Sequence, residues 1–125
     1  MKNSEIITAC ENLAVLIRKG EKYPVKFSYA VTRNFKILGN LMKVFEEERN
    51  KLLDQYNVKN KEGLPVYKES GTISIAEEYK LDWEKEIAEL LDIEVEFNPH
   101  TISPENLPDM IEPDTLYRLD FMIKE

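Results

Sequence analysis

The chain has 125 residues, is 42% hydrophobic and 33% charged, and carries a net charge of −7, which indicates one soluble, folded domain. Its apolar runs are too short to cross a bilayer, and residues 1–20 lack the apolar middle of a secretory signal. We therefore expect a cytoplasmic protein without membrane contact. We expect a single domain over residues 1–125, helical over 1–56, with a hairpin, a helix, a strand and a proline-rich tail over 57–125.

The first predicted helix covers about residues 4–18. Asn3 or Ser4 can serve as its N-cap, and Gly20 supplies a left-handed stop. Its apolar residues recur at helical spacing and include Cys10, which we interpret as a small buried residue because no neighbouring cation would activate its thiol.

The second predicted helix runs from about residue 24 to 56, and Pro24 suits its first position. Bulky residues follow one another at steps of three and four, which is typical of a packed seam. The first predicted helix is too short to cover this seam, so helix three or a second copy of the chain must cover the rest. The predicted oligomer seam contains Leu38, Met42, Phe45, Arg49 and Leu52.

Two residues interrupt this helix. Gly39 suggests close approach of another backbone. Arg49 has three structural interpretations: it fixes the register of the seam, it reaches past the edge to a carboxylate such as Glu46, or the seam ends near Phe45 and Arg49 is exposed. All three make Arg49 part of the scaffold, and the alternative is a role in recognition or catalysis.

The second half of the chain mixes element types. "LPVYK" and "TISI" flank "ESG" and predict a hairpin over 64–75, and "AEEYKLDWEKEIAELLD" predicts a third helix. "IEVEF" alternates strictly and predicts a strand over 93–97, while Pro104 and Pro113 begin short helical turns. No internal repeat is evident. We expect an α+β fold, with a long helix packed against two further helices and a small antiparallel sheet.

The chain contains no motif that identifies a reaction. It has no glycine-rich phosphate loop and no C-x-x-C, and His100 lacks a nucleophile or a second metal ligand. Asp92, Glu94 and Glu96 would share one strand face about 6.5–7 Å apart, too far for neighbours to hold one ion tightly. We expect no enzymatic activity, no metal and no cofactor.

Charge is divided unevenly along the chain. Residues 1–61 hold 12 Lys/Arg and 7 Asp/Glu, whereas residues 62–125 hold 5 and 17. The acidic half can fold onto the basic half, pair with it between two copies, or face a partner. Direct binding of nucleic acid is not expected, because the acidic half would repel a phosphate backbone.

Several segments, "NSEIITACENLAVLIRKG", "YPVKFSYAVTRN", "EEERNKLLDQY", "WEKEIAELLDIEVEF" and "TISPENL", resemble a family of small acidic proteins from bacteriophages and prophages of low-GC Gram-positive bacteria. The resemblance covers most of the chain and departs from the family in "VYKESGTISIAEEYKL" and in the C-terminal tail. The family carries no assigned activity, so it implies no site residues.

The acidic half and the phage resemblance together predict a protein that acts by binding another protein. The partner would be a basic, nucleic-acid-binding host protein such as a defence nuclease, which would make the chain an anti-CRISPR-like inhibitor. The expected partner-binding residues are Asp92, Glu94, Glu96, Glu86 and Glu89. The alternative is a virion component or assembly chaperone that forms homo-oligomers through the long helix.

Overall fold

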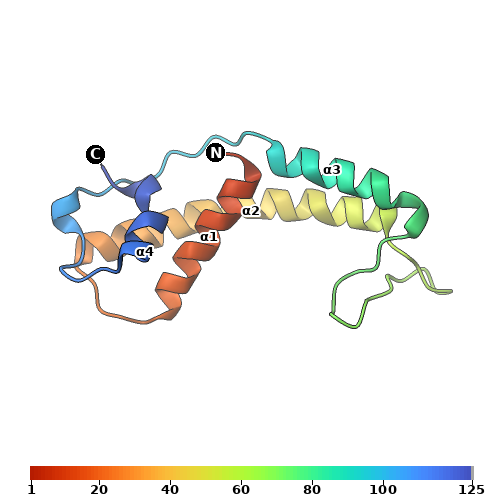
Figure 1. Ribbon diagram of the computed structural model, residues 1–125, viewed down its shortest axis with the longest axis horizontal. Coiled ribbons are helices and arrows are strands. Elements are labelled where there is room, and N and C mark those ends of the chain that lie inside the picture. Colours follow the sequence, from red (N-terminus) through yellow and green to blue (C-terminus); the bar gives the residue numbers. More distant parts are fainter. Residues whose placement is uncertain (125) are drawn as a thin grey trace. The chain divides into compact units, whose positions relative to one another are not determined.

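The computed structural model describes residues 1–124, and Figure 1 shows that helices dominate it. Helical residues make up 61% of the chain, and only 8% lie in strands or bridges. The main elements are the helices α1 (Asn3–Arg18), α2 (Val25–Tyr56), α3 (Lys80–Asp92) and α4 (Pro113–Arg118). Three short 3-10 turns, η1 (Glu77–Tyr79), η2 (Pro104–Asn106) and η3 (Asp120–Met122), complete them. Within residues 1–124, no helix is both long and apolar enough to cross a membrane.

The contacts divide the chain into two compact units, with the boundary inside α2. The terminal unit contains residues 1–42 and the chain from Glu94 onward, and the middle unit contains residues 43–93. This division into units does not test the expectation of a single domain, which stays a prediction.

Helix α1 begins and ends close to the predicted positions. Its N-cap is Lys2 rather than Asn3 or Ser4, and the Lys2 backbone N–H donates to Oε1 of Glu5 at 2.9 Å. At the other end Gly20 has a φ of 65°, which confirms the predicted left-handed stop.

Helix α2 confirms the predicted long helix, since it spans 32 residues, or about 48 Å at 1.5 Å per residue. The expectation for Gly39 was wrong. A Cβ built at this position meets nothing within 4 Å, so no other backbone approaches it. Arg49 is exposed and lies over the Phe45 ring, with 6.0 Å between Cζ and the ring centroid. The exposure of Arg49 agrees with the third interpretation, but the seam does not end near Phe45, because Tyr56 beyond Arg49 is 7% exposed.

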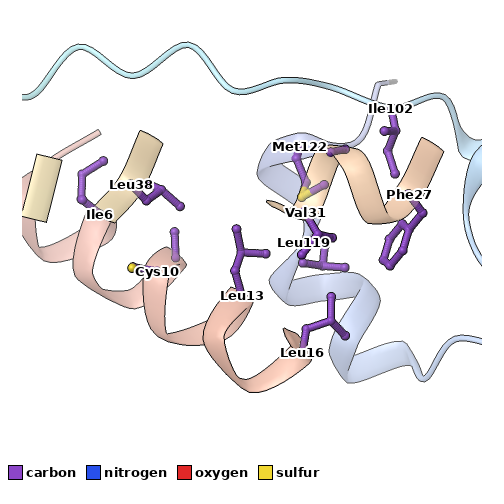
Figure 2. Packing of buried hydrophobic residues seen from close by; sticks show 12 residues of the cluster. Ile6, Cys10, Leu13, Leu16, Phe27, Val31, Leu38, Ile102, Leu119 and Met122 are labelled. Atoms are coloured by element: carbon purple, nitrogen blue, oxygen red, sulfur yellow. The ribbon is translucent and has the colours of Figure 1, made fainter. Parts of the chain in front are cut away.

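The core of the terminal unit forms where α1, the first half of α2 and the C-terminal segment meet (Figure 2). The largest fully buried apolar side chains in it are Phe27, Ile6, Leu13, Leu38, Leu119 and Met122. Cys10 lies in this core at 8% exposure, as predicted. Removing such side chains from water supplies most of the favourable free energy of folding.

One buried amide ties the C-terminal segment to α2. The side chain of Asn34, which is 0% exposed, donates from Nδ2 to the His100 carbonyl at 2.9 Å. Its Oδ1 accepts from the His100 backbone N–H at 2.7 Å. The polar groups of the buried amide are therefore satisfied by the His100 backbone, as the burial of Asn34 requires.

In the middle unit, α3 runs antiparallel to the C-terminal half of α2 (Figure 1). The Tyr56 and Tyr79 rings lie 5.6 Å apart. The apolar stripe of α3 is only half-buried, because α2 is the one α-helix of this unit, residues 43–93, that packs against it. Its half-buried residues are Trp83, Ile87, Leu90 and Leu91.

The predicted sheet does not form among the described residues, so the α+β fold class was wrong. The two segments of the predicted 64–75 hairpin do pair, through the antiparallel bridge Tyr67–Ile73 and the bond from the Lys68 N–H to the Thr72 carbonyl at 2.8 Å. They are two of three extended segments in residues 57–76, and the isolated bridges Asn57–Ile75 and Lys59–Pro65 link the third segment to them. The backbone N–H groups of Val58, Val66 and Ser74 bond the carbonyls of Ser74, Val58 and Val66, respectively, at 2.8–3.0 Å. The three bonds form a closed cycle in which each segment pairs with both others. Each pair of segments therefore shares only an isolated bridge, and no longer ladder forms.

These three segments form an eight-residue repeat that the sequence analysis missed. Each ends in a turn closed by a backbone bond: Gly63 to Asn60, Gly71 to Lys68, and Tyr79 to Ala76. The two glycines have φ values of 80° and 87°, which a side chain would strain. We call residues 57–79 the three-turn segment.

The predicted strand over 93–97 is also absent. Glu94 alone forms a bridge, with Lys2, and the Val95 backbone N–H donates to the Met1 carbonyl at 2.7 Å. Helix α1 begins at Asn3, so only two residues are available as a pairing partner. The alternation still separates Val95 and Phe97, which pack on the core, from exposed Glu94 and Glu96.

Candidate functional site

The five predicted partner-binding residues are divided between the two units. Glu86, Glu89 and Asp92 belong to α3 in the middle unit, whereas Glu94 and Glu96 lie in the extended segment of the terminal unit. The structure therefore does not bring all five into one site of defined geometry.

Glu94 and Glu86 interact with defined groups of the chain. Glu94 lies 3.5 Å from the terminal ammonium of Met1, although its side chain is still 72% exposed. Glu86 is half-buried beside the Tyr56 hydroxyl. Burial, followed by the hydrogen bond to Glu86 and its charge, raises the pKa of Tyr56. Glu89 and Glu96 are exposed.

The predicted oligomer seam is largely covered by the chain itself. Leu38 is 0% exposed and Phe45 is 6% exposed, so neither side chain is available to a second copy in this structure. Met42 and Leu52 are half-buried, and Arg49 is exposed. Self-association therefore stays a prediction that other surfaces would have to support.

A cavity of the terminal unit, about 540 Å³, lies between the loop after α1 and the loop before α4. We call it the acidic cavity. Its apolar wall contains buried Leu16 and half-buried Tyr23 and Ile111. Three exposed carboxylates border it, those of Glu21, Asp109 and Glu112.

Local structure positions these groups. The Tyr23 hydroxyl donates to Oε2 of Glu21 at 3.0 Å, which places this carboxylate at the ring edge. Burial, followed by the hydrogen bond to Glu21 and its charge, raises the pKa of Tyr23, so the hydroxyl remains a donor at neutral pH. On the opposite side, Met110 is 93% exposed between Asp109 and Ile111.

The acidic cavity has the chemistry of a receptor for a lysine or arginine side chain. The apolar wall can take the aliphatic stem, and the carboxylates can pair with the cationic head. Lys19 also lines the cavity and leaves the balance at one cation against three acids. An exposed methionine beside such a site adds an adaptable apolar contact.

The sequence analysis missed this site because its acids lie far apart in the chain. Glu21 precedes Asp109 by 88 positions, and only folding brings the two loops together. A weak signal was present in "LPDMIEPD", where a methionine and an isoleucine stand between acids in a loop bounded by Pro108 and Pro113.

No group of three or more His, Cys, Asp or Glu side chains within residues 1–124 is arranged to hold a metal ion. No family model, no curated protein and no solved structure matches this chain.

Proposed function

We propose that the protein is a phage-encoded accessory protein that has no enzymatic activity and acts in the host cytoplasm by binding a basic protein. The specific form of the proposal is an inhibitor of a host-defence nuclease, in which carboxylates occupy a surface that otherwise binds nucleic acid. The phage origin rests on the resemblance described above.

The acidic cavity is the observation that carries the proposal. Three carboxylates from two separate loops border an apolar wall, and the cavity of about 540 Å³ has room for one long cationic side chain together with neighbouring groups of a partner. Arginine is enriched among residues that dominate protein interfaces, and nucleic-acid-binding surfaces are rich in arginine and lysine. A basic surface of this kind would insert one such side chain into the cavity.

The rest of the acidic surface would assist by steering. Glu89 and Glu96, two of the predicted partner-binding residues, have exposed side chains that can face a partner. Exposed charges raise association rates at low salt more than they raise affinity.

A charge-matched pair of variants tests the proposal. Glu21→Gln/Asp109→Asn/Glu112→Gln removes the carboxylates of the acidic cavity, and Glu62→Gln/Glu69→Gln/Glu77→Gln removes three exposed acids of the middle unit. We expect the unmodified chain to capture a basic protein from host lysate at physiological salt, and nucleic acid to compete with it. The first variant should lose capture and protection in a plasmid-interference assay, and the second should retain both.

Two results would contradict this proposal. If no partner is captured and plasmid interference is unchanged, the proposed inhibition is wrong. If both variants lose capture equally, general charge rather than the acidic cavity is responsible.

A virion component or assembly chaperone is the second candidate. Exposed apolar side chains on both helices of the middle unit favour it, with Val44 of α2 61% exposed and Leu81 of α3 81% exposed. Such side chains are suited to contact with repeated subunits. Mass spectrometry of purified particles separates the two candidates, because a component is present at fixed stoichiometry and an inhibitor is absent.

A further inference from the structure

A second cavity of the terminal unit, about 390 Å³, lies at the start of α2 and differs in charge from the first. Lys26 and Lys124 line it, and none of the described residues that line it is acidic. The chain as a whole has 24 Asp/Glu against 17 Lys/Arg. We call this the basic cavity, and its composition favours an anionic ligand.

Backbone contacts hold both lysines beside one wall. Ile102 and Ile123 form a short parallel bridge. In it the Lys124 backbone N–H donates to the Ile102 carbonyl at 2.8 Å, and the Ile102 N–H donates to the Met122 carbonyl at 2.9 Å. Lys26 belongs to the first turn of α2. The segment that contains Thr101 and Ser103 lies between them and adds two hydroxyl groups to the lining.

An aromatic pair forms another part of the lining. The rings of Tyr29 and His100 lie 5.3 Å apart at an interplanar angle of 74°. The buried Asn34 amide bonds both the N–H and the carbonyl of His100, so the backbone that carries the imidazole is fixed while the side chain stays at the cavity. Tyr29 is 55% exposed, so this edge-to-face pair leaves ring surface accessible for contact with the planar ring of a ligand.

The position of the cavity at the start of α2 adds to its preference for anions. The first N–H groups of a helix have no acceptor within the helix, and its N-terminus carries partial positive charge. Val25 and Lys26, the first two helical residues, both line the cavity, and Val25 is 84% exposed. A phosphate here would meet backbone donors as well as the two ammonium groups.

We propose that the basic cavity binds a nucleoside monophosphate. The phosphate lies between Lys26 and Lys124 near the start of α2, and the base lies against Tyr29 and His100. A volume of 390 Å³ is within the range of small-molecule sites. This site is independent of the acidic cavity and of the proposed function.

Titration of the full chain with 5′-AMP tests the proposal, with inorganic phosphate and adenosine as separate probes. Isothermal calorimetry gives the affinities, and NMR shift changes should be confined to the residues of the basic cavity. We expect 5′-AMP to bind at least tenfold more tightly than either probe alone and to weaken as salt is raised.

Variants separate the two halves of the site. Lys26→Gln/Lys124→Gln should weaken 5′-AMP at least tenfold, whereas Lys22→Gln/Lys36→Gln, which changes the same charge at two exposed lysines outside the cavity, should change it less than twofold. Tyr29→Ala should weaken 5′-AMP and leave inorganic phosphate unchanged. The proposal is overturned if 5′-AMP does not bind at millimolar concentration, if both lysine pairs act equally, or if either probe alone binds as tightly as 5′-AMP.

Discussion

Two buried asparagines differ in whether their side-chain amides form hydrogen bonds. Asn34 of α2 is 0% exposed, and its amide bonds the His100 backbone in both directions. Asn57, one residue after α2, is 7% exposed, and neither its Oδ1 nor its Nδ2 has a partner among the described residues. Burial of an amide is costly unless its hydrogen bonds are made, so only Asn34 contributes to stability through its polar atoms.

Replacing each asparagine by leucine should therefore give different results. Asn34→Leu removes both hydrogen bonds to the His100 backbone and should lower the free energy of unfolding by about 1–3 kcal/mol. Asn57→Leu removes two unpaired polar atoms and should cost less than about 0.5 kcal/mol or be stabilising. Urea unfolding of both variants provides the test, and equal losses would contradict the assignment.

Tyr56 should produce an alkaline dependence of stability. Burial first, and then the Glu86 carboxylate, raise the pKa of Tyr56 above its ordinary value of 10.0. The unfolded chain then loses this proton at lower pH than the native chain. The stabilisation is complete below about pH 10 and is lost as the pH rises through the native pKa.

We expect Tyr56→Phe to flatten the fall in stability above about pH 10, as measured by urea unfolding at a series of pH values. Tyr117→Phe is the matched control, because this ring is 83% exposed. An identical alkaline fall in all three proteins would show that Tyr56 does not contribute to it.

At the scale of the elements, the helices follow from periodicity, whereas the extended segments depend on what is available to pair with them. The Met1–Lys2 stretch is too short to form a ladder with residues 93–97, and the three-turn segment closes on itself. Val58 and Val66, like Gly63 and Gly71, are eight positions apart, which was the sequence signal for the repeat.

Two glycines with different backbone conformations test this account of the elements. Gly39 lies inside α2 with nothing near its Cβ direction, so Gly39→Ala should raise the free energy of unfolding by about 0.4–1 kcal/mol. Gly71 has a φ of 87°, so Gly71→Ala should lower it by about 1–2 kcal/mol. Thermal unfolding of both variants gives the signs, and a destabilising Gly39→Ala would restore the idea of a close backbone contact.

At the scale of the whole molecule, burial differs between the two units. The terminal unit contains the main core, whereas the buried residues of the middle unit among those described are Phe45, Tyr56 and Asn57. Local opening requires less free energy where fewer apolar groups are buried.

Hydrogen exchange should therefore be faster in α3 than in α1. Both are amphipathic helices, and they differ in that α1 has six buried residues, from Asn3 to Leu16, whereas none of the residues of α3 is buried. Mass spectrometry or NMR of amide exchange at neutral pH provides the test. Equal protection of the two helices would show that an additional contact, such as a second copy, covers α3.

The sequence by itself determined the three main helices, their approximate extents and the division of charge, because these depend on neighbours within a few positions. Alternation also indicated that Val95 and Phe97 face the core, although Ile93, predicted on the same side, is 51% exposed. Only the tertiary structure decided that no sheet forms, that Arg49 is exposed, and that the acidic and basic cavities exist. The physical reason is that each of these depends on contacts between residues far apart in the chain, such as Asn34 with His100 and Glu21 with Asp109.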